Sequence, residues 1–400
     1  MLQYHDSAVP FRNIWFRPLK LDELIAMKTK ILFGQPSWRV AADSVEAFVT
    51  QLGGHLAPVT FQVKGKPIAP FSIAPWATEK VDKSLPPALR VLRGDFFCMP
   101  FGGNATPYRG ERHPLHGETA NAKWQLEAAE EGHLHLSLRT KVRSGRVDKH
   151  IFLRDGQNIV YQRHVVSGMS GPMSFGHHAT LRFPDHPGSG LISTSRFVFG
   201  QVYPDWFEKP EDRGYQALKP GAEFTSLAAV PTLTGDTTAV SRYPARRGFE
   251  DLVGLVADPA LTLGWTAVAL PKERYVWFAL RDPRVLTGTL FWLTNGGRHY
   301  APWNGRHVNV MGLEDVTTYF GPGLAESASE NGLTRRGYKT CTQLDPAAPL
   351  VVNYIFGVAG IPAGFDEVAN IEPISGGVEL RSQSGKSVRA KVETEFLYQV

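Results

Sequence analysis

Short runs in which apolar and polar residues alternate recur along most of the chain, and this pattern constrains the fold more than any other feature. Residues 59–63, 134–138, 147–153 and 159–165 alternate with a period of two, which is typical of half-buried strands. Segments of similar character lie at 252–256, 275–280, 286–293, 351–356 and 388–397. Because a parallel sheet would need helices between its strands, the pattern predicts an all-β fold, a large and mostly antiparallel sandwich.

Two local signals refine this prediction. Asp155-Gly156 separates two alternating segments, and an Asp-Gly pair favours the tight turn of a β-hairpin. Residues 204–244 are rich in Pro, Gly and Thr and are predicted to form loops that cover one end of the sheets.

The first part of the chain has a helical rather than an alternating pattern. Apolar residues recur at helical spacing over 21–31, and residues 44–52 run from Ser44, a plausible N-cap, to a stop at Gly53-Gly54. We therefore expect residues 1–54 to form a short helical extension packed on a main domain of residues 55–400.

Composition narrows the class of protein. Of 400 residues, 42% are hydrophobic and 20% charged, as in folded globular chains. The net charge of +5 is spread without a dense Lys/Arg run, so no nucleic-acid partner is expected. No apolar run of membrane-spanning length and no signal-like N-terminus occur, and neither Cys98 nor Cys341 belongs to a C-x-x-C motif. We expect a cytoplasmic protein, either a monomer or a homodimer.

Three clusters of ionisable residues lie between Gly and Pro turn signals at the ends of predicted strands. They occupy residues 100–124, 175–184 and 295–319. Taken singly, each residue has an ordinary explanation: a histidine among turns often caps a loop, and Glu314 could be an exposed charge at a strand end. Together, the three clusters predict a polar site built from distant strands.

The motifs in these clusters, in this order, resemble those of the aldose 1-epimerase (galactose mutarotase) superfamily. Leu115-His-Gly-Glu-Thr-Ala-Asn-Ala-Lys-Trp124 is similar to the motif in which His-Gly precedes an Asn and a Trp. His177-His-Ala-Thr-Leu181 resembles the second histidine motif, and Met311-Gly-Leu-Glu-Asp-Val-Thr317 resembles the late strand that carries a glutamate. Residues 53–61 resemble the early Gly-Gly strand. The resemblance implies a galactose mutarotase-like β-sandwich and an isomerase.

The resemblance also implies roles for individual residues. Glu314 is the expected base, His178 the expected acid, and His116 a hydrogen-bond donor to the sugar. His177 is a substrate-binding candidate and the rival for the acid role, because adjacent residues of a strand face opposite sides and only one of the two can point into the site. Asn121 is expected at the substrate or in support of the loop that carries His116.

Other substrate-binding candidates come from departures from the family pattern and from the tryptophans. The family often has an arginine where this chain has Ala120, so Arg109, Arg112 or Arg298 are candidates to replace it. Asp251 is the candidate for the family's substrate-binding aspartate. Trp303 and Trp124 are candidates to present an apolar face to a sugar ring.

Anomer interconversion needs a base at the anomeric hydroxyl and an acid at the ring oxygen, and a carboxylate with a histidine supplies both without a cofactor. The expected partner is a small-molecule carbohydrate, including a modified or anionic sugar. Two alternatives remain on the same fold: a non-catalytic carbohydrate-binding protein, and another carbohydrate-active enzyme such as a lyase or hydrolase. Hydrolysis normally uses two carboxylates, and Asp315 is a poor partner for Glu314 because it should face the other way.

A metal centre is the main competing chemistry. His113 and His116, with His177 or His178 and with Glu314, have the side chains to bind a divalent ion. A cupin-like site would place His-x-His in a glycine-rich strand, and none of the clusters has that arrangement. We therefore expect no metal.

Overall fold

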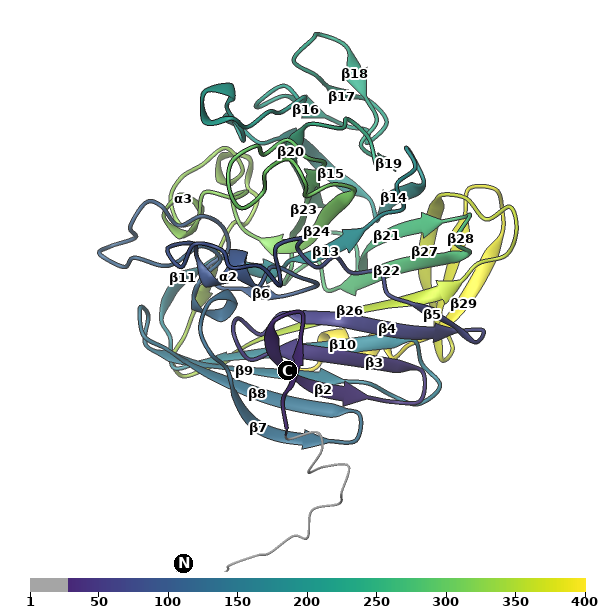
Figure 1. The fold of residues 1–400 in the computed structure, drawn as a ribbon, viewed down its shortest axis with the longest axis horizontal. Coiled ribbons are helices and arrows are strands. Elements are labelled where there is room, and N and C mark those ends of the chain that lie inside the picture. The colour runs from purple at the N-terminus through teal and green to yellow at the C-terminus, as the bar shows by residue number, and fades with distance from the viewer. Residues whose placement is uncertain (1–27) are drawn as a thin grey trace, which may run out of the picture.

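The computed structural model describes residues 28–400, and strands account for most of its regular structure (Figure 1). Three sheets of nine, eight and five strands form the body of the molecule, and the strands within each are paired antiparallel. The prediction of an all-β, antiparallel sandwich is confirmed.

The nine-stranded sheet has the order β19-β14-β21-β22-β26-β10-β9-β8-β7. Its strands are β7 (Gln125–Glu130), β8 (His133–Thr140), β9 (Gly145–Phe152), β10 (Ile159–Ser167), β14 (Gly190–Thr194), β19 (Arg242–Tyr243), β21 (Gly264–Leu270), β22 (Tyr275–Arg281) and β26 (Leu350–Gly360).

The eight-stranded sheet has the order β16-β15-β20-β23-β24-β12-β6, with β13 also paired to β24. Its strands are β6 (Phe97–Cys98), β12 (Phe175–His177), β13 (Ala179–Arg182), β15 (Phe197–Val202), β16 (Glu223–Phe224), β20 (Glu250–Ala257), β23 (Gly288–Thr294) and β24 (Val310–Thr317).

The five-stranded sheet contains β1 (Lys30–Leu32), β2 (Gln35–Ala41), β3 (Val45–Thr50), β4 (Leu56–Val63) and β5 (Lys66–Ile68). The smaller sheets contain β11 (Gly171–Met173) with β25 (Thr342–Leu344), β17 (Val230–Pro231) with β18 (Thr237–Thr238), and β27 (Val368–Ile374) with β28 (Gly377–Ser382) and β29 (Ser387–Lys391). The helical turns described are α2 (Pro87–Arg90), α3 (Leu324–Ser327), η1 (Glu118–Ala120), η2 (Pro210–Asp212), η3 (Thr334–Arg336) and η4 (Thr394–Tyr398).

The predicted helical extension is wrong wherever the structure describes it. Residues 45–50 form β3, which pairs with β2 on one side and β4 on the other, so one sheet runs across the expected boundary at residue 54. Residues 45–50 are buried except for the half-buried Glu46, so the segment shows no clean alternation that would distinguish a strand from a helix. Most of the predicted helix over residues 21–31 lies outside the described residues, and its last two residues belong to β1.

Most predicted strands are found. Residues 59–63 lie within β4 and 134–138 within β8, and the turn at Asp155-Gly156 joins β9 to its antiparallel partner β10. The segment 388–397 is only half strand, since β29 ends at Lys391 and η4 follows. Residues 204–244 contain loops and the short strands β16 to β19, and β16 to β18 lie at one end of the molecule (top of Figure 1).

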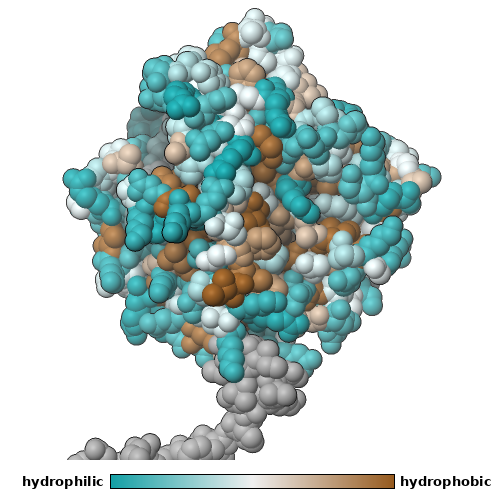
Figure 2. Space-filling model, viewed as in Figure 1, coloured by the Kyte–Doolittle hydropathy of each residue, from teal (hydrophilic) through white to brown (hydrophobic). Residues whose placement is uncertain are grey.

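Three apolar clusters lie between these layers. The main core packs the nine-stranded sheet against the inner faces of the other two, as in the contact of Phe61 with Phe356. A second core lies between the outer face of the nine-stranded sheet and the sheet of β27 to β29 (yellow in Figure 1). The third covers the other face of the eight-stranded sheet and includes Trp292, Trp303 and Phe96. Over the face shown in Figure 2, hydrophilic residues surround smaller hydrophobic patches.

The alternation along β24 decides which residues face the third cluster. Met311 and Leu313 belong to the main core, whereas Val316 belongs to the third cluster. Successive side chains of a strand point to opposite faces, so Glu314 lies with Val316 on the outer face of the sheet. The fold thereby brings a buried carboxylate among aromatic side chains.

Candidate active site

Glu314 and His178 meet at the outer face of the eight-stranded sheet. His178 lies between β12 and β13, which both pair with β24, through Gly176 to Val316 and through Ala179 to Leu313. The register is the same on both sides of this gap, so His178 lies opposite Glu314. The distance from His178 Nε2 to Glu314 Oε1 is 3.1 Å, and both side chains are about 95% buried, with exposed fractions of 5% and 4%.

The orientation of the His178 ring follows from its other contacts. Its Nδ1 lies 3.2 Å from Thr180 Oγ1, and that hydroxyl donates to the backbone carbonyl of His178 at 3.5 Å. With its hydrogen used there, the hydroxyl oxygen accepts from Nδ1–H, which leaves Nε2 as an acceptor facing Glu314. Phe96 stacks on the ring at 4.5 Å between centroids and fixes its plane.

His116 completes the polar end of the site from a separate loop. Its ring centroid lies 5.0 Å from that of His178, at an interplanar angle of 90°. His116 Nδ1 accepts from the backbone N–H of Gly102 at 3.3 Å, so Nε2 carries the ring proton. The next residue, Gly117, has φ of 74°, and a Cβ there would lie 1.9 Å from the carbonyl oxygen of Met99. Only glycine allows the chain to turn at this point.

Asn121 holds the loop that carries His116. Its Oδ1 accepts from the backbone N–H of Ala88 at 2.9 Å, and its Nδ2 donates to the carbonyls of Leu115 and Gly117, both at 2.6 Å. Asn121 is buried and does not line the cleft. Its placement at the substrate is therefore wrong, and the alternative of loop support fits its contacts.

Burial controls the proton distribution of the pair. It raises the pKa of Glu314 well above its ordinary range, against the opposing attraction of Arg298. Burial also lowers the pKa of His178 well below its ordinary range, and His116 and His55 lower it further. The pKa of His116 falls to about 4 for the same reason. Both shifts favour the neutral form of the pair, with the proton on Glu314, which is the reverse of the distribution that the sequence resemblance implies.

These side chains lie in a cleft of about 290 Å³. Its volume is at the lower end of the range for small-molecule sites. Most of its wall is aromatic or aliphatic, and the polar groups gather at one part of it. The lining residues are Ala88, Leu89, Leu92, Phe96, Phe101, Gly103, Leu115, His116, His178, Phe207, Leu252, Leu290, Trp292, Arg298, Tyr300, Trp303, Glu314 and Gly321.

Arg298 provides the cation of this cleft. Its Nε donates to Glu208 Oε1 at 2.6 Å, and its guanidinium lies 4.7 Å from the centroid of Trp303 and 5.5 Å from that of Trp292. Within residues 28–400, neither terminal nitrogen of Arg298 has a hydrogen-bond partner. The guanidinium group of Arg298 is thus held by one carboxylate and two indole rings, and its terminal N–H groups remain available to a ligand.

A second buried carboxylate stands behind Trp292. Glu250 accepts hydrogen bonds from Trp292 Nε1 at 3.2 Å and from Thr294 Oγ1 at 2.9 Å. Burial raises the pKa of Glu250 to about 8, partly offset by Arg298. Glu250 does not line the cleft, and its contact with the cleft wall is the hydrogen bond from the Trp292 indole.

His177 does not share the site with His178. It is fully buried on the opposite face, with Nδ1 2.9 Å from Asp95 Oδ2 and its ring stacked on Tyr354 at 4.1 Å. Asp95 also accepts from Gln162 Nε2. The prediction of His177 as a substrate or acid residue is wrong, since the alternation of the strand turns it into the main core.

Four further candidates also lie away from the cleft. Asp251 is buried and accepts from the backbone N–H groups of Ala217 and Leu218, at 3.0 and 2.8 Å. Arg109 is exposed and lies over the ring of Tyr108, and Arg112 is also exposed. Trp124 is buried, with its indole N–H donating to the carbonyl of Thr119. Of the arginine and tryptophan candidates, Arg298 and Trp303 line the cleft.

The residues named for a metal centre do not all converge, since His116, His178 and Glu314 line the cleft whereas His113 and His177 lie outside it. His113 Nε2 lies 2.9 Å from Glu111 Oε2, in a cluster with Arg143, and His113 does not line the cleft. No group of three His, Cys, Asp or Glu side chains in the described part of the chain is arranged to hold a metal ion.

Several cleft residues were not singled out from the sequence. Trp292 lies in a predicted strand, but nothing local showed which face it would take. Phe207 lies in the loop region 204–244, as does Glu208, which binds Arg298 without lining the cleft, and Tyr300 follows Arg298 in the chain. The sequence indicated only that the loops of residues 204–244 cover one end of the sheets. That expectation does not identify any individual residue as part of a site.

Comparison with known proteins supports the fold. No protein-family model and no curated protein matches the chain. A candidate aldose 1-epimerase from Escherichia coli K12 superposes with a TM-score of 0.56 at 14% identity, over 82% of this chain and all of that one. A galactose mutarotase related enzyme from Lactobacillus acidophilus gives 0.53 at 12% identity, over 84% of this chain and all of that one.

A galactose mutarotase-like protein from Lactobacillus casei gives a TM-score of 0.52 at 11% identity, over 80% of this chain and 99% of that one. At such identities the similarity establishes the architecture alone, and the galactose mutarotase-like β-sandwich that the sequence resemblance implies is confirmed. As for the membrane, none of the helices described within residues 28–400 has the length and apolar character needed to cross one.

Proposed function

We propose that the protein is an aldose 1-epimerase-like isomerase that interconverts the anomers of a sugar bearing an anionic group. The observation that carries this proposal is the contact of Glu314 with His178 at 3.1 Å in a cleft that also holds His116 and Arg298. Acid–base chemistry of this kind needs a carboxylate and an imidazole within hydrogen-bond reach of the same substrate atoms.

The pair carries one proton, which is enough for ring opening and reclosure. In the neutral form, Glu314 donates its proton to the ring oxygen while His178 Nε2 accepts the proton of the anomeric hydroxyl. The bond from the anomeric carbon to the ring oxygen breaks, and a carbonyl forms. After rotation about the adjacent C–C bond, Glu314 takes the proton back and His178 returns its own. The roles implied by the resemblance, Glu314 as base and His178 as acid, are those of the closing step.

His116 and Arg298 position the sugar. His116 Nε2–H is the donor for a sugar oxygen, since its Nδ1 is occupied by Gly102. The free terminal nitrogens of Arg298 suit a carboxylate or phosphate substituent, because a guanidinium fork binds such groups through two hydrogen bonds. Trp303 and Trp292 supply the apolar face against the ring.

The test is anomer exchange followed by NMR across a panel of neutral sugars, uronic acids and sugar phosphates. Glu314→Gln should slow exchange of the accelerated sugar by about 10²–10⁴-fold. Glu211→Gln, at an exposed glutamate on η2, serves as the matched control. A panel in which no sugar is accelerated, or a Glu314→Gln protein as active as the control, contradicts the proposal.

The lining of the cleft favours one second candidate, a carbohydrate-binding protein without catalysis. His178 and Glu314 satisfy each other directly, and many of the remaining lining residues are apolar. Saturable binding of a sugar acid without anomer exchange would select this candidate. Hydrolysis by two carboxylates finds less support, because Glu314 is the one carboxylate among the described residues that line the cleft.

A further inference from the structure

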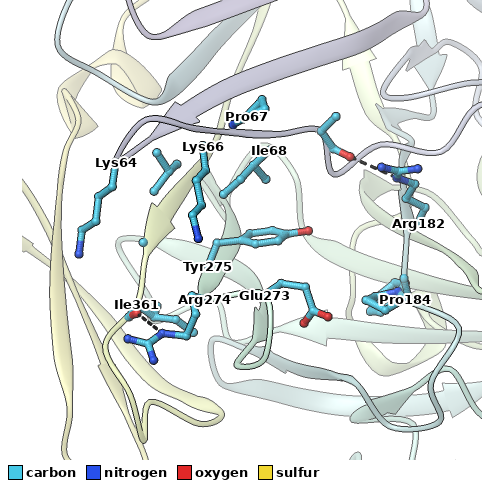
Figure 3. Close-up of a pocket in the computed structure, with 14 residues that line it drawn as sticks. Lys64, Lys66, Pro67, Ile68, Arg182, Pro184, Glu273, Arg274, Tyr275 and Ile361 are labelled. Atoms are coloured by element: carbon cyan, nitrogen blue, oxygen red, sulfur yellow. Dashed lines mark hydrogen bonds between the residues drawn. The ribbon is translucent and has the colours of Figure 1, made fainter.

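A second hollow, larger than the histidine cleft, opens on another part of the molecule (Figure 3). It has a volume of about 720 Å³ and shares no lining residue with the cleft. Its walls come from the turn between β4 and β5, the end of β13, the turn between β21 and β22, and the end of β26. Nothing in the proposed epimerase chemistry uses it.

Cationic side chains dominate the wall of this hollow. Lys64, Lys66, Arg182 and Arg274 line it, and Glu273 is the one acidic residue among its lining. None of the four cations forms an ion pair with a carboxylate within residues 28–400. Because neighbouring like charges without counterions repel, this arrangement favours an anionic ligand.

The two arginines are already held in place. Arg182 Nε donates to the carbonyl of Ala69 at 3.3 Å, and Arg274 Nε donates to the carbonyl of Ile361 at 3.1 Å, as the dashed lines in Figure 3 show. Each bond uses the inner nitrogen and leaves the two terminal nitrogens of the fork unused. A fixed fork loses less conformational entropy when a carboxylate binds.

Tyr275 adds a neutral donor. Its ring crosses the middle of the hollow in Figure 3, between Lys66 and Glu273, and its hydroxyl has no hydrogen-bond partner in the described part of the chain. Pro67, Ile68 and Pro184 give the same hollow apolar surfaces.

The hollow continues into a neighbouring one of about 510 Å³. The two share Ala69, Arg182 and Phe183, so Arg182 lies on their common wall. Phe33, which is 48% exposed, lines the neighbouring hollow and offers it a flat aromatic face. Together the two hollows form an extended groove, cationic along one half, with Arg182 at its middle.

We propose that this groove binds an acidic oligosaccharide, with carboxylates on Lys64, Lys66, Arg182 and Arg274 and sugar rings against the proline, isoleucine and Phe33 surfaces. Two adjoining hollows of about 720 and 510 Å³ offer room for a chain of sugars rather than for a single anion alone. A single-stranded nucleic acid would need successive exposed aromatic rings, and the aromatic residues of the cationic half, Tyr275 and Phe183, are mostly buried. This site is independent of the proposed epimerase function.

The experiment is calorimetric titration of the whole protein with tetragalacturonic acid at low salt, beside maltotetraose and a four-nucleotide single-stranded DNA. Tetragalacturonic acid should bind saturably, and its affinity should fall as salt is added. Maltotetraose and the DNA should bind much more weakly than the tetra-acid. Lys66→Glu/Arg274→Glu should weaken binding at least tenfold. Lys80→Glu/Lys83→Glu, at exposed lysines outside the groove, is the charge-matched control and should bind as the wild type does.

A circular dichroism spectrum confirms that each double variant folds, and Arg182→Gln provides a milder change if the first does not. Absence of tetra-acid binding overturns the proposal, as does equal weakening in the control. Equal binding of the DNA overturns the assignment to carbohydrate. Glu314→Gln should leave tetra-acid binding unchanged. A failure of the groove proposal can therefore be told apart from a failure of the epimerase proposal.

Discussion

The carboxylate of Glu314 occupies the space that a side chain at Gly312 would need. Both residues lie on the outer face of β24, and a Cβ built on Gly312 would lie 2.5 Å from Glu314 Oε1 and 3.1 Å from Trp292 Cβ. The position of the carboxylate beside His178 therefore depends on a missing methyl group two residues away. Glycine in a strand often marks such a close approach.

Gly312→Ala should displace Glu314 while leaving the fold intact. The nearest atom is the far end of a flexible side chain, so the carboxylate can move away, and the contact with His178 is lost. We expect anomer exchange to fall toward the level of Glu314→Gln, with a loss of unfolding free energy of about 1–2 kcal/mol. NMR exchange rates and urea denaturation measure the two effects. Full activity in Gly312→Ala would show that the carboxylate does not need its present position.

His177 and His178 should respond oppositely to the same substitution. His177→Gln disturbs the hydrogen bond to buried Asp95, so we expect a loss of stability of about 1–3 kcal/mol with anomer exchange preserved in the folded fraction. His178→Gln should reduce exchange by about 10²–10⁴-fold with little loss of stability. Denaturation curves and exchange rates on both variants provide the check. The reverse pattern would mean that the strand presents the other histidine to the substrate.

Arg298→Lys should separate binding of the substrate from its chemistry. Lysine keeps the charge but loses the planar fork that lies over Trp303 and bonds Glu208. We expect KM for an anionic sugar to rise about tenfold or more, with a smaller change in kcat, as for a residue that binds the ground and transition states alike. A neutral sugar, if accepted at all, should show little change. Equal effects on both sugars would remove the argument for an anionic substituent.

The buried His55 should make the protein sensitive to acid. It stacks on Phe96 at 4.0 Å, and burial lowers its pKa from 6.5 to about 3. A depressed folded-state pKa contributes stability that is present above the unfolded pKa and is lost as the pH falls toward the folded one. Between pH 6 and 4, unfolding free energy should therefore decrease by about 1 kcal/mol per pH unit from this residue.

His55→Gln should reduce that slope, since glutamine does not titrate and its amide can replace the contact of His55 Nε2 with the carbonyl of Ala120. His186→Gln, at an exposed histidine, is the control. Urea denaturation at several pH values gives the slopes. A slope that is the same in wild type and His55→Gln would show that the native state does not keep His55 neutral.

The sequence predicted the strands well because alternation is a local property. Over much of β8, β9 and β10, buried side chains alternate with partly exposed ones, and the period of two is visible without knowing the partners. β3 was missed for a related reason. Its residues are nearly all buried, so Val45 to Thr50 show no clean alternation, and the Gly53-Gly54 pair marks the end of a strand as well as it would mark the end of a helix.

The residue types of the site came from the sequence, and their arrangement came from the tertiary structure. Glu314, His178 and His116 were marked by motifs around turns, but which member of His177-His178 faces the cleft depends on the pairing of β12 and β13 with β24. From the sequence, Arg298 and Arg109 were equal candidates for the substrate-binding arginine. In the structure, the loops bring Glu208 and the tryptophans to Arg298. The neutral state of the Glu314–His178 pair likewise follows from burial, which arises only when sheets and loops close around it.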